Sequence, residues 1–168
     1  GGLTSGDIKN AAESLATRQE NVQQSTHHLF LGQKRVAVIQ ETWDPARRIL
    51  TRVSRLLQSE DGASTVTIIL DAAGFVVAAD YMRESDRGGR NVSLQRAEQG
   101  LMLFSDKTTG MEKTLSEHPL VLLDALHYVS PVSSPKEVTV ADLSTGEAML
   151  ATLDSAGKKI VLKTEQGF

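Results

Sequence analysis

Apolar residues recur every seven positions along the first part of the chain, at Ile8, Leu15, Val22, Leu29 and Val36. This period predicts one long N-terminal helix over residues 1–42, because it places the residues in one stripe. The positions three residues further on are mostly small or polar, so the pattern is only half of a coiled-coil heptad. Two interpretations stay open: a stalk-like helix that forms a homodimer with a copy of itself, or an amphipathic helix that packs on its own domain.

The stretch WDPARRILTRVSRLLQSEDG predicts a second helix. Asp44 suits the N-cap and Pro45 the first helical position, where the missing N–H costs nothing. Asp61 and Gly62 end the pattern. The apolar face of this helix would carry Ile49, Leu50, Val53, Leu56 and Leu57. Four arginines lie mostly off that face and are expected in solvent: Arg47, Arg48, Arg52 and Arg55.

From Ser64 onward the pattern changes to strands. STVTIILD and GFVVAADY are joined by Asp71-Ala72-Ala73-Gly74, which predicts a hairpin. Near the C-terminus, three short strands are expected, with turns at residues 142–146 and 154–157. Between these regions, NVSLQRAEQG predicts a short helix ending at Gly100, and SEHPLVLLDALHYVSPV predicts a helix passing into a strand near Tyr128. This order of helices and strands predicts an α+β fold, with both N-terminal helices packed on one antiparallel sheet of about five to six strands.

Composition narrows the classes of function. The 168 residues are 40% hydrophobic, and the net charge of -3 with a pI near 5.8 argues against a nucleic-acid binder. The absence of cysteine excludes disulfides, thiolate metal sites and cysteine nucleophiles. No apolar run approaches the roughly 20 residues of a membrane span. Because the chain begins GGLTSG, we expect a trimmed or processed piece, with membrane contact only through segments absent from it.

Nothing in the sequence predicts an enzyme. Nucleophile-elbow, Walker and Rossmann glycine motifs are absent. His27 and His28 would point about 100° apart on a helix and so would not share a metal. His118 and His127 lack ligand spacing. We therefore expect no catalytic residue, no metal and no cofactor.

The loop after the predicted hairpin has a different chemistry. Arg83, Arg87, Arg90 and Arg96 fall within 14 residues, beside Gly88-Gly89, Asn91 and Ser93. Guanidinium groups and short polar side chains suit the recognition of a carboxylate. The alternative is a solvated loop whose arginines pair with Glu84 and Asp86.

Three pieces of the sequence resemble one family: TIILDAAGFVVAAD, GGRNVSLQRA and HYVSPV. Their order over residues 40–165 is similar to that in Cache-type, PAS-like extracytoplasmic sensor domains, in particular those of dicarboxylate-sensing histidine kinases. The resemblance implies a PAS/Cache-like domain over residues 43–168, with a pocket between the sheet and its loops. By position it implies that Arg90, Asn91 and Ser93 contact the ligand from the loop, that Tyr128 and Ser130 face them, and that Arg96 is the ligand-facing arginine.

Two functions of different classes follow. The first is a non-enzymatic sensor domain of a membrane-bound receptor, on the periplasmic or extracellular side, that binds a small anion such as a carboxylate. A cytoplasmic GAF-like or roadblock-like module would show the same order of elements. The second is a structural or assembly protein, a virion or secretion-machine subunit, that uses the long helix and the charged loop as subunit interfaces.

Overall fold

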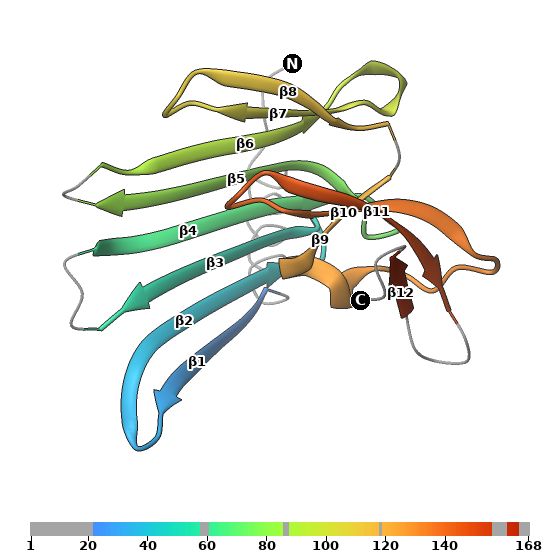
Figure 1. The fold of residues 1–168 in the computed structure, drawn as a ribbon. Helices are drawn as coiled ribbons and strands as arrows, with labels where there is room; N and C mark the ends of the chain where they lie inside the picture. Colours follow the sequence, from blue (N-terminus) through green and yellow to red (C-terminus); the bar gives the residue numbers. More distant parts are fainter. Residues whose placement is uncertain (1–21, 58–60, 86–87, 118, 156–160, 165–168) are drawn as a thin grey trace, which may run out of the picture.

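In a computed structural model, the described residues form two packed β-sheets (Figure 1). The structure describes residues 22–57, 61–85, 88–117, 119–155 and 161–164. The larger sheet has eight antiparallel strands in sequence order: β1 (Gln23–Leu31), β2 (Lys34–Asp44), β3 (Ile49–Leu56), β4 (Asp61–Leu70), β5 (Val76–Ser85), β6 (Arg90–Arg96), β7 (Met102–Asp106) and β8 (Met111–Ser116).

The smaller sheet has four strands in the order β12-β11-β10-β9. Its strands are β9 (Leu120–Leu122), β10 (Lys136–Asp142), β11 (Glu147–Asp154) and β12 (Val161–Thr164). β9 runs parallel to β10, and the other pairs are antiparallel. The described helical segments are two 3-10 turns, η1 (Glu98–Gly100) and η2 (Leu123–Tyr128).

The larger sheet is amphipathic because its side chains alternate between two faces. One row of paired positions on the inner face is apolar and buried, and it contains Trp43, Leu50, Ile68, Ala79, Leu94 and Phe104. The adjacent row on the outer face is polar, with Thr42, Thr51, Thr67, Asp80, Ser93 and Ser105. The alternation therefore specifies which face the smaller sheet covers.

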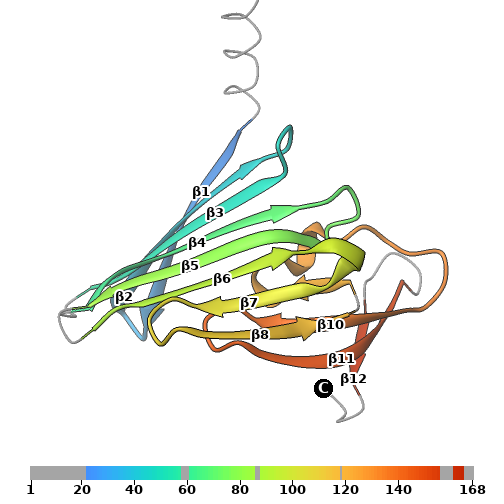
Figure 2. The same ribbon diagram turned by 90° about the horizontal axis from the view of Figure 1, so that it is seen from above.

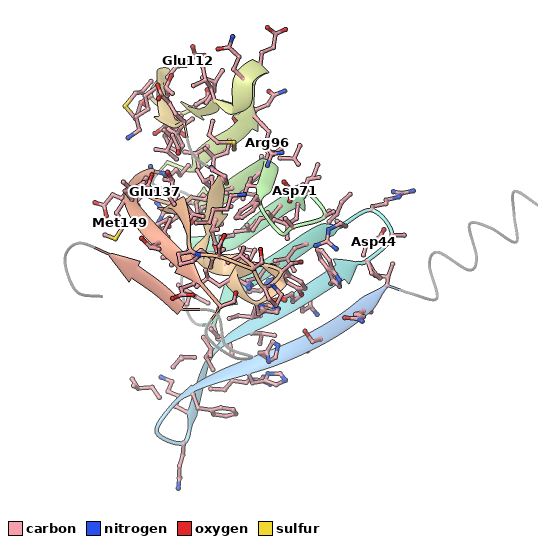
Figure 3. All side chains as sticks on the ribbon, turned by 90° about the vertical axis from the view of Figure 1, so that its right-hand side faces the viewer. Asp44, Asp71, Arg96, Glu112, Glu137 and Met149 are labelled. Atoms are coloured by element: carbon pink, nitrogen blue, oxygen red, sulfur yellow. The ribbon has the colours of Figure 1, made fainter. Side chains whose placement is uncertain are left out.

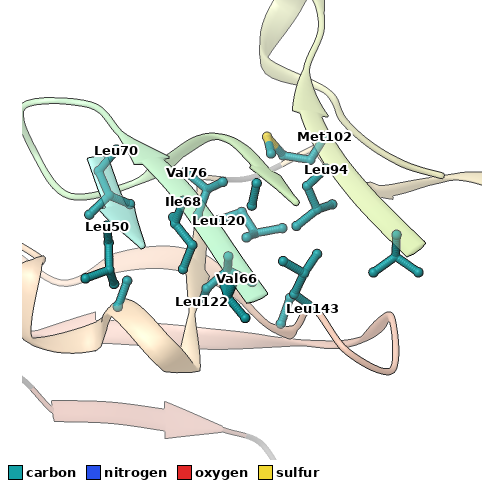
Figure 4. Packing of buried hydrophobic residues seen from close by; sticks show 14 of the residues in the cluster. Leu50, Val66, Ile68, Leu70, Val76, Leu94, Met102, Leu120, Leu122 and Leu143 are labelled. Atoms are coloured by element: carbon teal, nitrogen blue, oxygen red, sulfur yellow. The ribbon is translucent and has the colours of Figure 1, made fainter. Parts of the chain in front are cut away.

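The core lies between the two sheets. Leu120, Leu122 and Leu143 from the smaller sheet and its loop pack against Leu50, Ile68 and Leu94 (Figure 4). On the opposite face of the smaller sheet, a second cluster joins Val121, Val138 and Leu153 to Phe75 and Val129. The β1–β2 hairpin projects away from the smaller sheet (Figures 1 and 2).

The expected α+β fold with long helices is therefore wrong in the described part of the chain. The stretch predicted as the second helix forms a turn and strand β3. The Asp44 carboxylate accepts the N–H groups of Ala46 and Arg47 at 3.0 and 3.2 Å, as an N-cap would. The backbone of Arg48, with φ of 56°, then leaves the helical region. β-branched residues at alternate positions favour the strand that follows.

The predicted N-terminal helix is also corrected where it is described. Residues 1–21 lie outside the described residues, but residues 23–31 and 34–44 form the hairpin of β1 and β2. Gly32 supplies the turn with φ of 65°. The expected boundary between residues 42 and 43 falls inside β2. Leu29 and Val36, two members of the seven-residue stripe, therefore lie on different strands.

Expectations based on turn chemistry fared better than those based on helical periodicity. The Asp71–Gly74 hairpin is confirmed between β4 and β5, and the Asp142–Gly146 hairpin between β10 and β11. The short helix expected from Asn91 to Gly100 is wrong, because most of it is strand β6 and only η1 is helical. Near Tyr128 the expected order is reversed: the strand β9 comes first and η2 follows it.

Candidate functional site

A groove runs between the edge strand β8 and the β10–β11 hairpin, and we call it the intersheet groove. It consists of two adjoining hollows of about 640 Å³ and about 530 Å³. Both hollows are lined by Thr114, Leu115, Ala148 and Met149, so they form one continuous surface. Within the described residues, β8 pairs only with β7, which leaves its other edge beside the groove.

The first end of the groove is set by the tip of the β10–β11 hairpin. Gly146, with φ of 74°, lies so close to the Phe104 ring that a Cβ at this position would be 2.8 Å from it. The Asp142 carboxylate stabilises the turn by accepting the backbone N–H and the hydroxyl of Ser144, at 3.0 and 2.7 Å. The Lys113 ammonium also lies over the Phe104 ring, 5.4 Å from its centroid.

The second end of the groove is set by two buried hydroxyls, Ser116 on β8 and Thr139 on β10, which hydrogen-bond to one another. This contact joins the two sheets, and the groove opens between it and Phe104. The two sheets are thus in contact at both ends of the groove, and the groove is the open space between these two contacts.

The groove is aliphatic with an acidic rim. Ala141 and Leu115 line its interior, while Leu123 and Leu150 remain 52% and 43% exposed. Exposed aliphatic side chains gathered in a hollow are typical of binding sites. The charged groups along it are three carboxylates, from Glu117, Asp142 and Glu147, against the one ammonium of Lys113. A cation would therefore be favoured at the rim over an anion.

A separate polar cluster attaches η2 to the larger sheet. Arg52 donates to Asp124 Oδ1 at 2.6 Å and to Glu41 Oε2 at 2.9 and 3.1 Å. It also donates to the Asp124 carbonyl oxygen at 3.0 Å. The expectation that Arg52 is solvated is wrong, because its side chain is only 20% exposed. These groups satisfy one another, so the cluster is a structural clamp.

Aromatic rings continue this clamp. The Tyr128 ring stacks on Trp43 with centroids 4.2 Å apart and lies 3.9 Å from His127. Its hydroxyl donates to Glu41 Oε1 at 3.3 Å. Burial raises the pKa of Tyr128 above the ordinary value of 10.0, and the Glu41 carboxylate raises it further. Tyr128 therefore remains a neutral donor within the cluster.

Of the six residues predicted to bind a ligand, Arg90 and Asn91 come together. They line a hollow of about 460 Å³ that also contains Arg83 and Lys107. Arg90 Nη2 lies 3.9 Å from Asp106 Oδ2, and its buried Nε has no hydrogen-bond partner among the described residues. Burial alone would raise the pKa of Asp106. The N–H donors of residues 108 and 109 and the Arg90 charge outweigh it and hold the pKa below 3.8.

The other four predicted residues lie elsewhere. Arg96 donates to Asp71 Oδ2 at 3.1 Å and to the Val76 carbonyl oxygen at 2.8 Å (Figure 3). The Ser130 N–H donates to the Ala73 carbonyl oxygen at 2.9 Å, beside the same turn. Tyr128 belongs to the clamp, and Ser93 belongs to the outer face of β6, opposite Asp80 and Ser105. The structure therefore does not assemble the six residues into one pocket.

Comparisons with protein-family models, curated proteins and solved structures gave no match. Nothing in them bears on the resemblance to Cache-type domains. Among the described residues, no group of three or more His, Asp and Glu side chains is placed to hold a metal ion. No helix in this part of the chain has the length and apolar character needed to cross a membrane.

Proposed function

We propose that the protein is a non-enzymatic binding module whose intersheet groove takes an elongated ligand with an apolar chain and a cationic head. The observation that carries this proposal is the combination of an aliphatic hollow with an acidic rim. An apolar chain would cover the exposed side chains of Leu123 and Leu150, and burial of each methylene contributes about 0.8 kcal/mol. The carboxylates at the rim favour a cationic head over an anionic one.

Two amphiphiles that share one tail test this proposal. Octylammonium is expected to raise the melting temperature and to move the amide signals of Leu115 and Met149 in an NMR titration. Octanoate has a nearly matching tail but an anionic head. A favourable and an unfavourable charge contact near a surface differ by about 1 kcal/mol, so we expect octanoate to bind at least roughly fivefold more weakly than octylammonium.

Two lysine substitutions localise the effect. Leu150→Lys places a cation in the groove wall and should abolish octylammonium binding. Ile69→Lys is the control, because Ile69 is 37% exposed on the outer face and Leu150 is 43% exposed. Unchanged binding by Leu150→Lys, or equal binding of both amphiphiles, contradicts the proposal.

A second candidate is the anion binding expected from the sequence, which we propose for the hollow lined by Arg83, Arg90, Asn91 and Lys107. Three cationic side chains and one carboxylate, Glu84, line this hollow, which supports recognition of a small anion. Succinate in the same titration should move the Asn91 amide, and Arg90→Gln should remove that shift. Attachment to a receptor and a location outside the cytoplasm stay predictions.

A further inference from the structure

Strand β1 is an edge of the larger sheet with no neighbour on its outer side among the described residues. It pairs only with β2, and every residue from Gln23 to Leu31 is exposed. A strand of nine residues is roughly 30 Å long. Such an edge presents a row of backbone N–H and C=O groups that can pair with another strand.

The chemistry of this edge favours pairing. Its sequence, QQSTHHLFL, contains no acidic residue, no lysine or arginine and no proline. Those residues are the usual means by which proteins block an edge strand. The opposite edge of the same sheet, β8, is shorter and carries Glu112 and Lys113. The β1 edge is therefore long and uncharged, and its end carries Leu29, Phe30 and Leu31, which are 47%, 60% and 78% exposed.

We propose that β1 pairs antiparallel with β1 of a second copy, joining two eight-stranded sheets into one, and that acidification separates them. A two-fold axis requires one surface to be complementary to itself. An uncharged strand meets this condition because it does not repel its own copy. We consider the two antiparallel registers in which His27 or His28 lies opposite its own copy. Each residue then lies opposite one whose number differs from its own by an even number, so the two point to the same face. The inner faces of both sheets therefore stay on one side.

The pH dependence follows from where the imidazoles lie. In either register one of the two histidines lies directly opposite its own copy at the axis, and the other lies one position away on the opposite face, so that two rings lie near the axis on each face of the joined sheet. Imidazoles become cationic as the pH falls from about 7 to about 5. Like charges directly opposite one another destabilise a strand pair. The dimer is therefore favoured at neutral pH and opposed at acidic pH.

Few other charges lie near these rings. β2 is the one described element packed beside β1, where His27 lies opposite Ile39 and His28 opposite Val38. Glu41 is diagonal to His27, but its carboxylate is bound to Arg52. Arg55 is the next residue beyond Val38 in the row of His28, and it would add to the repulsion of a cationic ring.

Light scattering of the full chain at about pH 7.5 and about pH 5 tests the proposal. We expect the measured mass to equal that of two chains at the higher pH and that of one chain at the lower pH. Thr26→Lys introduces a charge on the β1 edge and should give one chain at both values. Thr67→Lys makes the same change at a central strand of the same face and should leave the dimer intact.

Two further variants separate the alternatives. The double variant His27→Gln/His28→Gln should remain dimeric at both pH values, because it cannot gain charge. Leu15→Lys tests a dimer formed through the N-terminal segment, and it should have no effect if β1 forms the interface. One chain at neutral pH, a dimer insensitive to Thr26→Lys, a dimer lost in Leu15→Lys, or acid dissociation of the double glutamine variant would each overturn the proposal.

Discussion

At the scale of single residues, Gly74 positions the turn on which the second cluster is built. Its backbone has φ of 91°, and its N–H donates to the Asp71 carbonyl oxygen at 3.0 Å. The segment after η2 crosses directly over it, so that a Cβ on Gly74 would lie 2.5 Å from Val129 Cα and against the Tyr128 carbonyl oxygen. Both neighbours are backbone atoms and cannot move aside as a flexible side chain would.

We therefore expect Gly74→Ala to lower the free energy of unfolding by more than about 3 kcal/mol, because strain and a backbone clash add. Gly110→Ala is a matched control. Gly110 also has a positive φ, of 79°, but nothing lies within 4 Å of the position of its Cβ. It should cost only about 1–2 kcal/mol. Urea denaturation measures both, and equal losses would show that the close approach of Val129 is unimportant.

At the scale of elements, Arg52 makes the ionic part of the contact between η2 and the larger sheet, beside the stacking of Tyr128 on Trp43. Arg52 reaches from β3 to Glu41 on β2 and to both the side chain and the backbone of Asp124 on η2. The planar guanidinium group holds its N–H donors in fixed directions, so Arg52 makes these hydrogen bonds simultaneously. A lysine ammonium does not reproduce this geometry.

Arg52→Lys should therefore destabilise the protein by about 1–3 kcal/mol, while the charge is unchanged. Arg55→Lys is the control, since Arg55 is exposed three residues further along the same strand. Thermal unfolding of both variants distinguishes the two positions. A stability loss that is the same in both would indicate that the Arg52 hydrogen bonds contribute nothing specific.

The elements also show what the sequence can predict. The turns after Leu70 and Ala141 are predictable because aspartate and glycine act within a few residues. Strand β3 is not, because its apolar residues satisfy both a helical and a strand period, and Asp44 makes the bonds of an N-cap without a helix following. Only pairing with β2 and β4 decides between them.

The intersheet groove could not be predicted for a related reason. Its lining comes from residues 113–117, 139–142 and 145–150, together with Leu123, and no local motif joins them. Of the residues predicted to form an anion site, Arg90 and Asn91 line the same hollow because they are neighbours in sequence. Tyr128 and Ser130 were expected to face them, but tertiary contacts draw these two residues to Trp43 and Ala73 instead.

At the scale of the whole molecule, one core joins the two sheets. Its main cluster contains residues from β2 through β7 together with Leu120, Leu122 and Leu143. Because neither sheet buries its apolar face alone, we expect the two to unfold in a single transition.

Two probes test this cooperativity. Trp43, the one tryptophan of the chain, is buried under Tyr128 and reports on the larger sheet. A fluorophore attached to Met149→Cys would report on the smaller sheet, because the natural sequence has no other cysteine to label. The two urea transitions should have the same midpoint. A lower midpoint for the label would show that the smaller sheet detaches first.

The strand order of the larger sheet also has a consequence for synthesis. Each of its strands pairs with the preceding one, so the whole meander can assemble as the ribosome releases it, with short loops to close at every step. The covering strands β9 to β11 follow in the chain only after β8. The nascent polypeptide therefore passes through a stage in which Leu50, Ile68 and Leu94 face water. At that stage the exposed apolar surface favours aggregation.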